Sequence, residues 1–287
     1  MISAMNPGAF GALDVDFCRY ETASIAVLPI PYDGTSTWMK GADFGPQAMI
    51  DASAHMELYD IETDAEVFRH GIATLAPVDC PDDPEEMAGA VYERTKTLLE
   101  ARKFVVGVGG EHSVSVGLVR AAAERFPNLS VLQFDAHSDT RETYEGSRFN
   151  HACVMARIGE MCPYVQVGIR SMDVSECAGL NRERTFFAHE IAAGMNIVPK
   201  VLKALTKTVY ITIDLDVLDP SVMPSTGTPE PGGLDWYTLL NLLSPVIAEK
   251  NVVGMDVTEL LPHPDNKAPD LLAAKLIYRT LSMIFDR

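Results

Sequence analysis

Acidic and imidazole side chains follow three short apolar segments of this sequence, at spacings that suit metal binding. The candidate ligands are His112, Asp135, His137, Asp139, Asp214 and Asp216. Side chains two residues apart in an extended segment share a face, so Asp135, His137 and Asp139 can converge. Asp214 and Asp216 have the same spacing. Ionised carboxylates resist crowding beside an apolar sheet unless cations neutralise them, so the pattern predicts a pair of divalent metal ions.

The chemistry expected of such a site is hydrolysis, because two divalent ions lower the pKa of water. Nitrogen and oxygen ligands without thiolates favour Mn²⁺ over the zinc of structural sites. Taken singly, each motif also has an interpretation without metal, since an Asp-x-Asp after a strand is usually an Asx turn. Their concurrence after several strands favours metal. Gly107, Gly109 and Gly110 lack the third glycine of a dinucleotide loop, so a Rossmann fingerprint is rejected.

The elements that must position these residues are strands that alternate with helices. Continuous apolar segments predict strands covered on both faces, as in a parallel sheet, over residues 25–30, 104–108, 130–134, 164–168, 209–213 and 252–256. Helices are predicted over residues 83–100, 113–125 and 198–205, with another beginning near Pro46. The alternation predicts an open α/β sheet in a single domain over residues 1–287. Ligands bind beyond the carboxyl ends of such strands, where the candidate residues lie.

Composition narrows the possible partners. The 287 residues include 23 basic and 40 acidic side chains, a formal net charge of -17, so nucleic acid is excluded and a cationic substrate is favoured. The five cysteines are scattered, which predicts reduced thiols rather than a disulfide framework. We expect no signal peptide, no membrane span and a cytoplasmic location.

Four motifs carry a family resemblance. Residues 109–113 (GGEHS), 135–139 (DAHSD), 213–220 (IDLDVLDP) and 226–233 (TGTPEPGG) resemble the signatures of the ureohydrolase (arginase/agmatinase) family. The resemblance runs from about Pro29 to near the C-terminus. It implies a three-layer α/β/α fold with a mainly parallel sheet of about eight strands. It also implies two Mn²⁺ per subunit, hydrolysis of a guanidino compound to urea and an amine, and homotrimers or homohexamers.

The resemblance assigns a role to each matching residue. It implies that His112, Asp139, Asp214 and Asp216 bind one ion. For the other ion it implies Asp135, His137, Asp214 and Asp216, so that Asp214 and Asp216 are shared. His151 resembles the proton-shuttling histidine of the family, and Glu259 resembles the glutamate that pairs with the guanidinium. Asp139, His151 and Glu259 are therefore the expected catalytic residues, with Asp139 carrying a proton to the leaving amine.

The substrate is expected to be agmatine, cleaved to urea and putrescine. Residues 140–150 do not match the loop with which arginases bind the α-amino and α-carboxyl groups of arginine. The glutamate at position 230 is the residue type that resembles agmatinases at this place in the motif. Arg141, a candidate substrate-binding residue, is interpreted as a surface charge or, alternatively, as a receptor for the carboxylate of guanidinobutyrate or guanidinopropionate. N1-aminopropylagmatine is a further candidate. Asp51 lies where family members often have Arg.

Two rival functions remain. A zinc-dependent amide hydrolase of the histone-deacetylase type needs a tandem histidine pair, and the sequence contains no His-His dipeptide. A non-catalytic metal-binding regulatory paralogue would not need His151 and Glu259 together with all six ligands. The sequence therefore favours an enzyme.

Overall fold

One parallel sheet organises the protein, for which a computed structural model describes residues 8–286. In that part of the chain the strand order is β2-β1-β3-β8-β7-β4-β5-β6, and every pairing is parallel. The strands are β1 Ile25–Ile30, β2 Ile72–Thr74, β3 Phe104–Gly109, β4 Leu129–Phe134, β5 Tyr164–Ile169, β6 Thr185–Phe187, β7 Thr208–Asp214 and β8 Asn251–Thr258. The expected parallel sheet of about eight strands is confirmed. A single domain over residues 1–287 stays a prediction.

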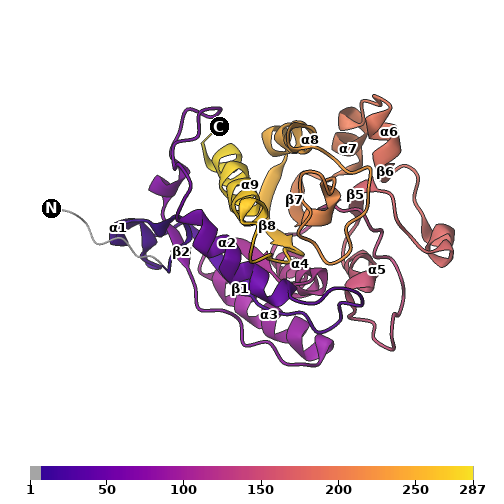
Figure 1. Ribbon diagram of the computed structural model, residues 1–287, viewed down its shortest axis with the longest axis horizontal. Coiled ribbons are helices and arrows are strands. Elements are labelled where there is room, and N and C mark those ends of the chain that lie inside the picture. Colours follow the sequence, from indigo (N-terminus) through magenta and orange to yellow (C-terminus); the bar gives the residue numbers. More distant parts are fainter. Residues whose placement is uncertain (1–7, 287) are drawn as a thin grey trace.

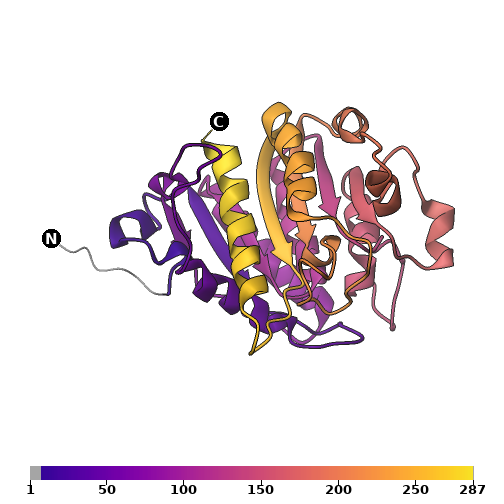
Figure 2. The same ribbon diagram turned by 45° about the horizontal axis from the view of Figure 1, so that its top comes forward.

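The helices of the described part pack on both faces of this sheet. The α-helices are α1 Val15–Cys18, α2 Gly45–Ser53, α3 Pro84–Glu100, α4 Ser115–Arg125, α5 Val154–Gly159, α6 Ala188–Ala192, α7 Val198–Ala204, α8 Trp236–Glu249 and α9 Ala268–Phe285. The 3₁₀ helices are η1 Phe10–Ala12, η2 Ala42–Phe44, η3 Val67–His70, η4 His112–Val114, η5 His151–Cys153, η6 Val174–Gly179 and η7 Leu215–Val217. In both views α1 lies at the opposite end of the molecule from α6 and α7 (Figures 1 and 2).

Local sequence signals explain where the predicted helices begin. The Asp83 side chain accepts hydrogen bonds from the backbone N–H groups of Glu85 and Glu86, and Pro84 occupies the first turn of α3. The segment expected to form one helix over 113–125 starts as η4 and continues as α4. Pro46 lies in the first turn of α2, as expected.

Alternation along the strands divides the core into two layers. In β1, Ile25 and Val27 join the cluster formed with α2, α7, α8 and α9, whereas Ala26 and Leu28 join the cluster formed with α3, α4 and α5. Successive side chains of a strand point to opposite faces, so one buried strand supplies both clusters. The result is the three-layer α/β/α architecture that the sequence predicts (Figure 2).

A row of polar side chains crosses the apolar sheet near its carboxyl end. Register aligns one residue from each of five adjacent strands: Asp256, Thr212, Gln133, Gln166 and Thr185. These five residues, called the polar row below, are at most 2% exposed. Each is hydrogen-bonded to a neighbour in the row, through Thr212 to Asp256 at 2.7 Å, Gln166 to Gln133 at 2.7 Å and Thr185 to Gln166 at 3.3 Å. Buried polar groups are tolerated only when they are paired in this way.

None of the helices within residues 8–286 is long and apolar enough to cross a membrane.

Candidate metal centre

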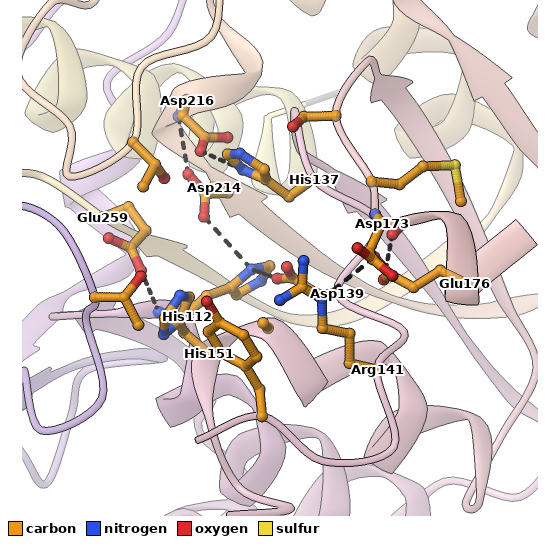
Figure 3. A pocket seen from close by; sticks show the side chains of 17 residues that line it. His112, His137, Asp139, Arg141, His151, Asp173, Glu176, Asp214, Asp216 and Glu259 are labelled. Atoms are coloured by element: carbon orange, nitrogen blue, oxygen red, sulfur yellow. Dashed lines mark hydrogen bonds and ion pairs between the residues drawn. The ribbon is translucent and has the colours of Figure 1, made fainter.

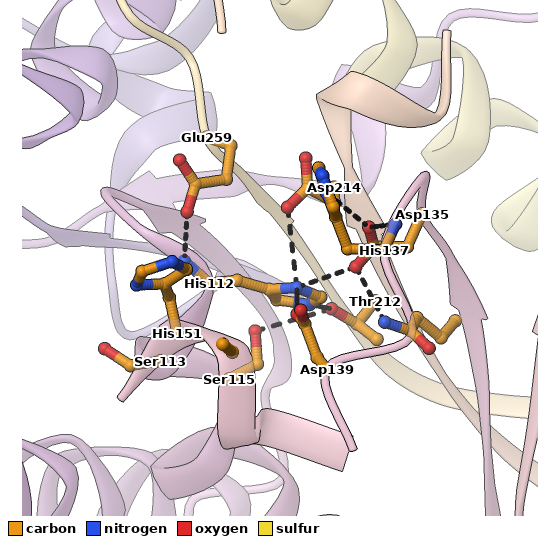
Figure 4. Close-up of polar contacts among 12 residues, drawn as sticks. His112, Ser113, Ser115, Asp135, His137, Asp139, His151, Thr212, Asp214 and Glu259 are labelled. Carbon is orange, nitrogen blue, oxygen red and sulfur yellow. Dashed lines mark hydrogen bonds and ion pairs between the residues drawn. The ribbon is translucent and has the colours of Figure 1, made fainter. Parts of the chain in front are cut away.

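His112 is the centre of the first group of candidate ligands. It follows β3 as the first residue of η4 and is 1% exposed. Its Nδ1 lies 3.0 Å from Asp135 Oδ2, 3.1 Å from Asp139 Oδ2 and 3.5 Å from Asp214 Oδ2 (Figure 4). Three carboxylates from the ends of β4 and β7 therefore face one imidazole nitrogen from the end of β3.

His137 is the centre of the second group. Its Nδ1 lies 2.9 Å from Asp216 Oδ2 and 3.7 Å from Asp135 Oδ1. The outer edge of the ring is half-buried, and Nε2 is 4.0 Å from Glu230 Oε1. The six residues predicted as ligands thus lie together at the carboxyl end of the three strands β3, β4 and β7.

Asp135 contacts both imidazole groups. Asp216 lies beside His137, whereas Asp135 reaches both imidazoles, and the sharing of Asp214 and Asp216 between two ions stays a prediction. The two oxygens of Asp135 point in different directions, Oδ2 toward His112 and Oδ1 toward His137. Two triads of ligand atoms within 4.8 Å of one another, His112–Asp135–Asp139 and Asp135–His137–Asp216, have Asp135 in common.

Turns, and not the pleat of a strand, bring the ligands together. Asp135 Oδ1 accepts a hydrogen bond from His137 N at 2.6 Å, and Asp214 Oδ1 accepts one from Asp216 N at 2.9 Å. Asp139 has a φ of 51°, in the left-handed region, and this turns the chain back toward His112. The Asx turns that offered the plainer interpretation of these motifs are therefore present, and they form the site.

The donor set fits divalent cations. Burial and then the nearby charges of Asp139 and Asp216 raise the pKa of Asp135 to about 7. Burial and then Asp216 also raise the pKa of Asp214. Carboxylates that disfavour their own ionisation need a compensating positive charge. Four carboxylates and two imidazoles, without sulfur, are ligands of the kind that bind Mn²⁺ and similar ions.

The polar row holds two of the ligands in place. Gln133 Nε2 donates to Asp135 Oδ2 at 2.7 Å, and His112 Nε2 lies 2.9 Å from Thr212 Oγ1. The Thr212 hydroxyl proton goes to Asp256 Oδ1, so its oxygen accepts the proton on His112 Nε2. His112 Nδ1, which faces the carboxylates, is therefore the nitrogen that would bind a metal ion once its proton is displaced. A histidine ligand is normally fixed by such a hydrogen bond on its other nitrogen.

Glu259 places a carboxyl group beside the ligands. It follows β8 with a φ of 67°, is 7% exposed, and accepts a hydrogen bond from His112 N at 2.8 Å through Oε1. Burial and then Glu111 raise its pKa. Within the described residues no cationic side chain pairs with it, so the carboxylate is available to a cationic ligand.

A cavity of about 300 Å³ opens onto these groups (Figure 3). Its lining includes five of the six candidate ligands, all except Asp135, together with His151 and Glu259. The outer wall is formed by Arg141, Tyr144, Met172, Asp173 and Glu176. The predicted catalytic residues Asp139, His151 and Glu259 therefore share one cavity.

Arg141, interpreted from the sequence as a surface charge or as a carboxylate receptor, lies in the wall of the cavity. Its guanidinium stacks over the Tyr144 ring at 4.3 Å, and its Nε lies 3.6 Å from Glu176 Oε2. The side chain is 28% exposed and lines the cavity. Asp51 lies away from the cavity, on α2, where it accepts a hydrogen bond from Gln47.

Sequence reasoning missed several polar residues behind the site. Thr35, Thr212 and Gln133 lie outside the motifs, Glu111 lies inside the 109–113 motif without an assigned role, and only the fold reveals what they contact. The one available signal was position, because Glu111 precedes His112 directly and Thr212 lies two residues before Asp214.

Comparisons with known proteins agree with this geometry. A model of the arginase family matches residues 23–282. The chain belongs to the arginase family. Relatives include an N(1)-aminopropylagmatine ureohydrolase of Thermus thermophilus, 40% identical over 92% of this chain and 91% of that protein. An agmatinase of Pyrococcus horikoshii is 32% identical over 92% of this chain and 93% of its own length.

A solved structure extends the agreement to the fold. The agmatine ureohydrolase of Thermoplasma volcanium superposes with a TM-score of 0.84 at 28% identity, covering 95% of this chain and 94% of that one. Membership of the arginase family, with these relatives, indicates a hydrolase that acts on guanidino carbon–nitrogen bonds. The expectation from the sequence motifs is thereby confirmed.

Proposed function

We propose that this arginase-family protein hydrolyses agmatine to urea and putrescine at a centre of two Mn²⁺ ions. The ligands in this proposal are His112, Asp135, His137, Asp139, Asp214 and Asp216. The observation that carries it is the buried Glu259 carboxylate, which lacks a cationic partner in the described part of the chain and faces the same cavity as the ligands. A guanidinium supplies the missing positive charge through paired, charge-assisted hydrogen bonds.

The residues divide the work of one hydrolysis. Two bound divalent ions supply the Lewis acidity that makes water a nucleophile near neutral pH. Glu259 holds the guanidinium so that its central carbon faces the ligands. Asp139 takes a proton from the attacking water and passes it to the alkyl nitrogen as the carbon–nitrogen bond breaks. His151 exchanges protons between the cavity and solvent, so the products are urea and a free amine.

The far end of the substrate is expected to be cationic. The outer wall of the cavity carries Asp173 and Glu176, and Glu230 lies just beyond His137. Arg141 is already beside the Glu176 carboxylate, which offsets the charge that a substrate carboxylate would need. This arrangement argues against guanidinobutyrate and guanidinopropionate.

N1-aminopropylagmatine is the second candidate. A hollow of about 430 Å³ shares Arg141, Tyr144, Asp173 and Glu176 with the cavity, so it lies directly beside the cavity. A substrate with an additional aminopropyl arm could occupy it. The Thermus thermophilus relative named for this substrate is consistent with that option.

A urea-release assay tests the proposal. Protein reconstituted with Mn²⁺ is offered agmatine, N1-aminopropylagmatine, arginine and guanidinobutyrate at equal concentrations. We expect urea from agmatine, with kcat/KM above that for arginine by at least about 100-fold, the loss expected when buried charges lack their partner. Urea from none of the four would favour a non-catalytic metal-binding paralogue, and preference for guanidinobutyrate would restore a carboxylate-binding role to Arg141.

Three further points belong to the same proposal. The native ions are Mn²⁺, the subunits assemble as homotrimers or homohexamers, and the enzyme works in the cytoplasm in putrescine biosynthesis. Metal analysis of protein purified without added metal, and its mass in solution, test the first two.

A further inference from the structure

One hydroxyl links the proton-exchanging histidine to the loop between β1 and η2. Thr35 Oγ1 lies 2.9 Å from His151 N and 3.1 Å from His151 Nδ1. The same oxygen lies 2.6 Å from Glu111 Oε1. Three segments far apart in the sequence therefore meet at Thr35.

Counting protons fixes the direction of these hydrogen bonds. A threonine hydroxyl has one proton to donate and lone pairs that accept. Glu111 is fully buried, and its oxygens accept from Thr35 N at 2.6 Å and from Ser113 Oγ at 2.5 Å. Thr35 therefore donates its proton to this carboxylate. Its lone pairs are left for the two nitrogens of His151, and Nδ1 must carry a proton to reach them.

We propose that Thr35 and Glu111 are positioning residues that hold the His151 ring with its proton on Nδ1 and its lone pair on Nε2. This inference rests on the role proposed for His151 above. His151 lines the cavity (Figure 3), and in the described structure no protein group is hydrogen-bonded to its Nε2. Nε2 is then the atom that takes up and releases protons. The bond from Nδ1 to Thr35 persists in both charge states, because the imidazolium also carries a proton on Nδ1.

The loop that carries Thr35 is itself held close to the strand ends. A Cβ added at Gly110 would lie 2.0 Å from Tyr32 O, so the loop backbone packs directly against this glycine. Asp33 Oδ2 accepts hydrogen bonds from Gly41 N and Ala42 N and closes the other end of the loop. His151 is therefore oriented before any substrate arrives, so no conformational entropy is lost in ordering its side chain during the reaction.

Replacing Thr35 separates positioning from folding. Thr35→Val keeps the shape of the side chain but removes the acceptor for His151. We expect kcat to fall about tenfold, the effect of one lost hydrogen bond to a proton-transfer group, with KM and the Mn²⁺ content close to wild type. Thr35→Ser restores the hydroxyl and should restore kcat. Ser36→Ala is the matched control, because Ser36 also contacts Glu111, at 3.4 Å, but not His151.

The ring protons can be observed without activity. In histidine-labelled protein loaded with diamagnetic Zn²⁺, ¹⁵N spectra should show His151 with a protonated Nδ1 and an unprotonated Nε2, assigned by its absence in His151→Asn. Thr35→Val should lose this pattern. A wild-type His151 protonated on Nε2, or a Thr35→Val enzyme with unchanged kcat, would overturn the inference. An equal fall in kcat in the Ser36→Ala variant would also overturn the inference. Failure of the proposed function is distinct, because it appears as absent urea release in the wild type.

Discussion

At the scale of single residues, the site depends on charges that lack their partners until ligands bind. Glu259 shows this most clearly, since it is buried, accepts one backbone hydrogen bond and faces a cavity lined by further acids. A buried charge without a partner is unfavourable, so a bound substrate cation would stabilise the Glu259 carboxylate by pairing with it.

Glu259→Gln tests that role. The amide keeps the size of the side chain but removes the charge, so we expect kcat/KM for agmatine to fall by at least about 100-fold. The Mn²⁺ content should stay at two per subunit, because Glu259 is not a ligand. Full activity in this variant would contradict the proposal that Glu259 binds the substrate guanidinium.

Thr212→Val tests how the polar row supports the metals. The change leaves His112 Nε2 without its acceptor, so we expect the affinity for one of the two ions to fall about 10–100-fold. Equilibrium dialysis against Mn²⁺ measures this. Tyr210→Phe is the control, because Tyr210 donates to the same Asp256 carboxylate at 2.8 Å without contacting His112. Equal losses of metal in both variants would contradict the argument.

The sequence predicts which residues gather at the site but not how their carboxylate oxygens are oriented. The types and spacing of the six candidate ligands were sufficient to group them. The direction of each carboxylate oxygen was not predictable, because it depends on turns such as the left-handed backbone at Asp139. For the same reason the double contact of Asp135 could not be foreseen.

At the scale of elements, strand burial carried most of the predictive signal. The six apolar segments predicted as strands all form strands, because each is long enough to be buried on both faces. β2 and β6 were missed, since each has only three residues and lies at an edge of the sheet. Edge strands need less apolar surface, so their sequences resemble loops.

Packing between α3 and α4 provides a test at this scale. A Cβ added at Gly117 of α4 would lie 2.5 Å from Ala88 O in α3, so Gly117→Ala should lower the free energy of unfolding by about 1–3 kcal/mol. Gly89→Ala is the matched change in α3, where nothing lies within 4 Å. It should raise the free energy of unfolding by about 0.5–1 kcal/mol. Urea denaturation of both variants measures the difference, and equal effects would contradict this account of the helix contact.

At the scale of the whole molecule, part of the net charge of -17 is concentrated where cations are expected. Without metal, a raised pKa means that the folded protein holds a proton that the unfolded chain releases. The pKa of Asp135 rises from 3.8 to about 7 through burial and neighbouring carboxylates. The pKa of His137 rises from 6.5 to about 10, because Asp216 outweighs the lowering effect of burial. Both groups therefore make metal-free protein less stable as pH rises.

Thermal unfolding with and without a chelator tests this sign. Between about pH 5 and about pH 9 we expect the melting temperature of metal-free protein to fall by roughly 5–10 °C. The gap in melting temperature between Mn²⁺-loaded and metal-free protein should widen over the same pH range, because metal binding displaces these protons. Asp51→Asn, on the exposed side of α2, should leave the gap unchanged. A gap that narrows with rising pH would show that other groups dominate.

The place of β8 in the sheet has a consequence for synthesis of the chain. β8 is the last strand in sequence, yet it inserts between β3 and β7 near the middle of the sheet. A nascent chain that has not yet passed residue 258 therefore leaves facing edges of β3 and β7 without hydrogen-bond partners, and such edges invite aggregation. Until that strand emerges from the ribosome, chaperones are expected to bind the growing polypeptide, and a truncated translation product would be a target for proteolysis.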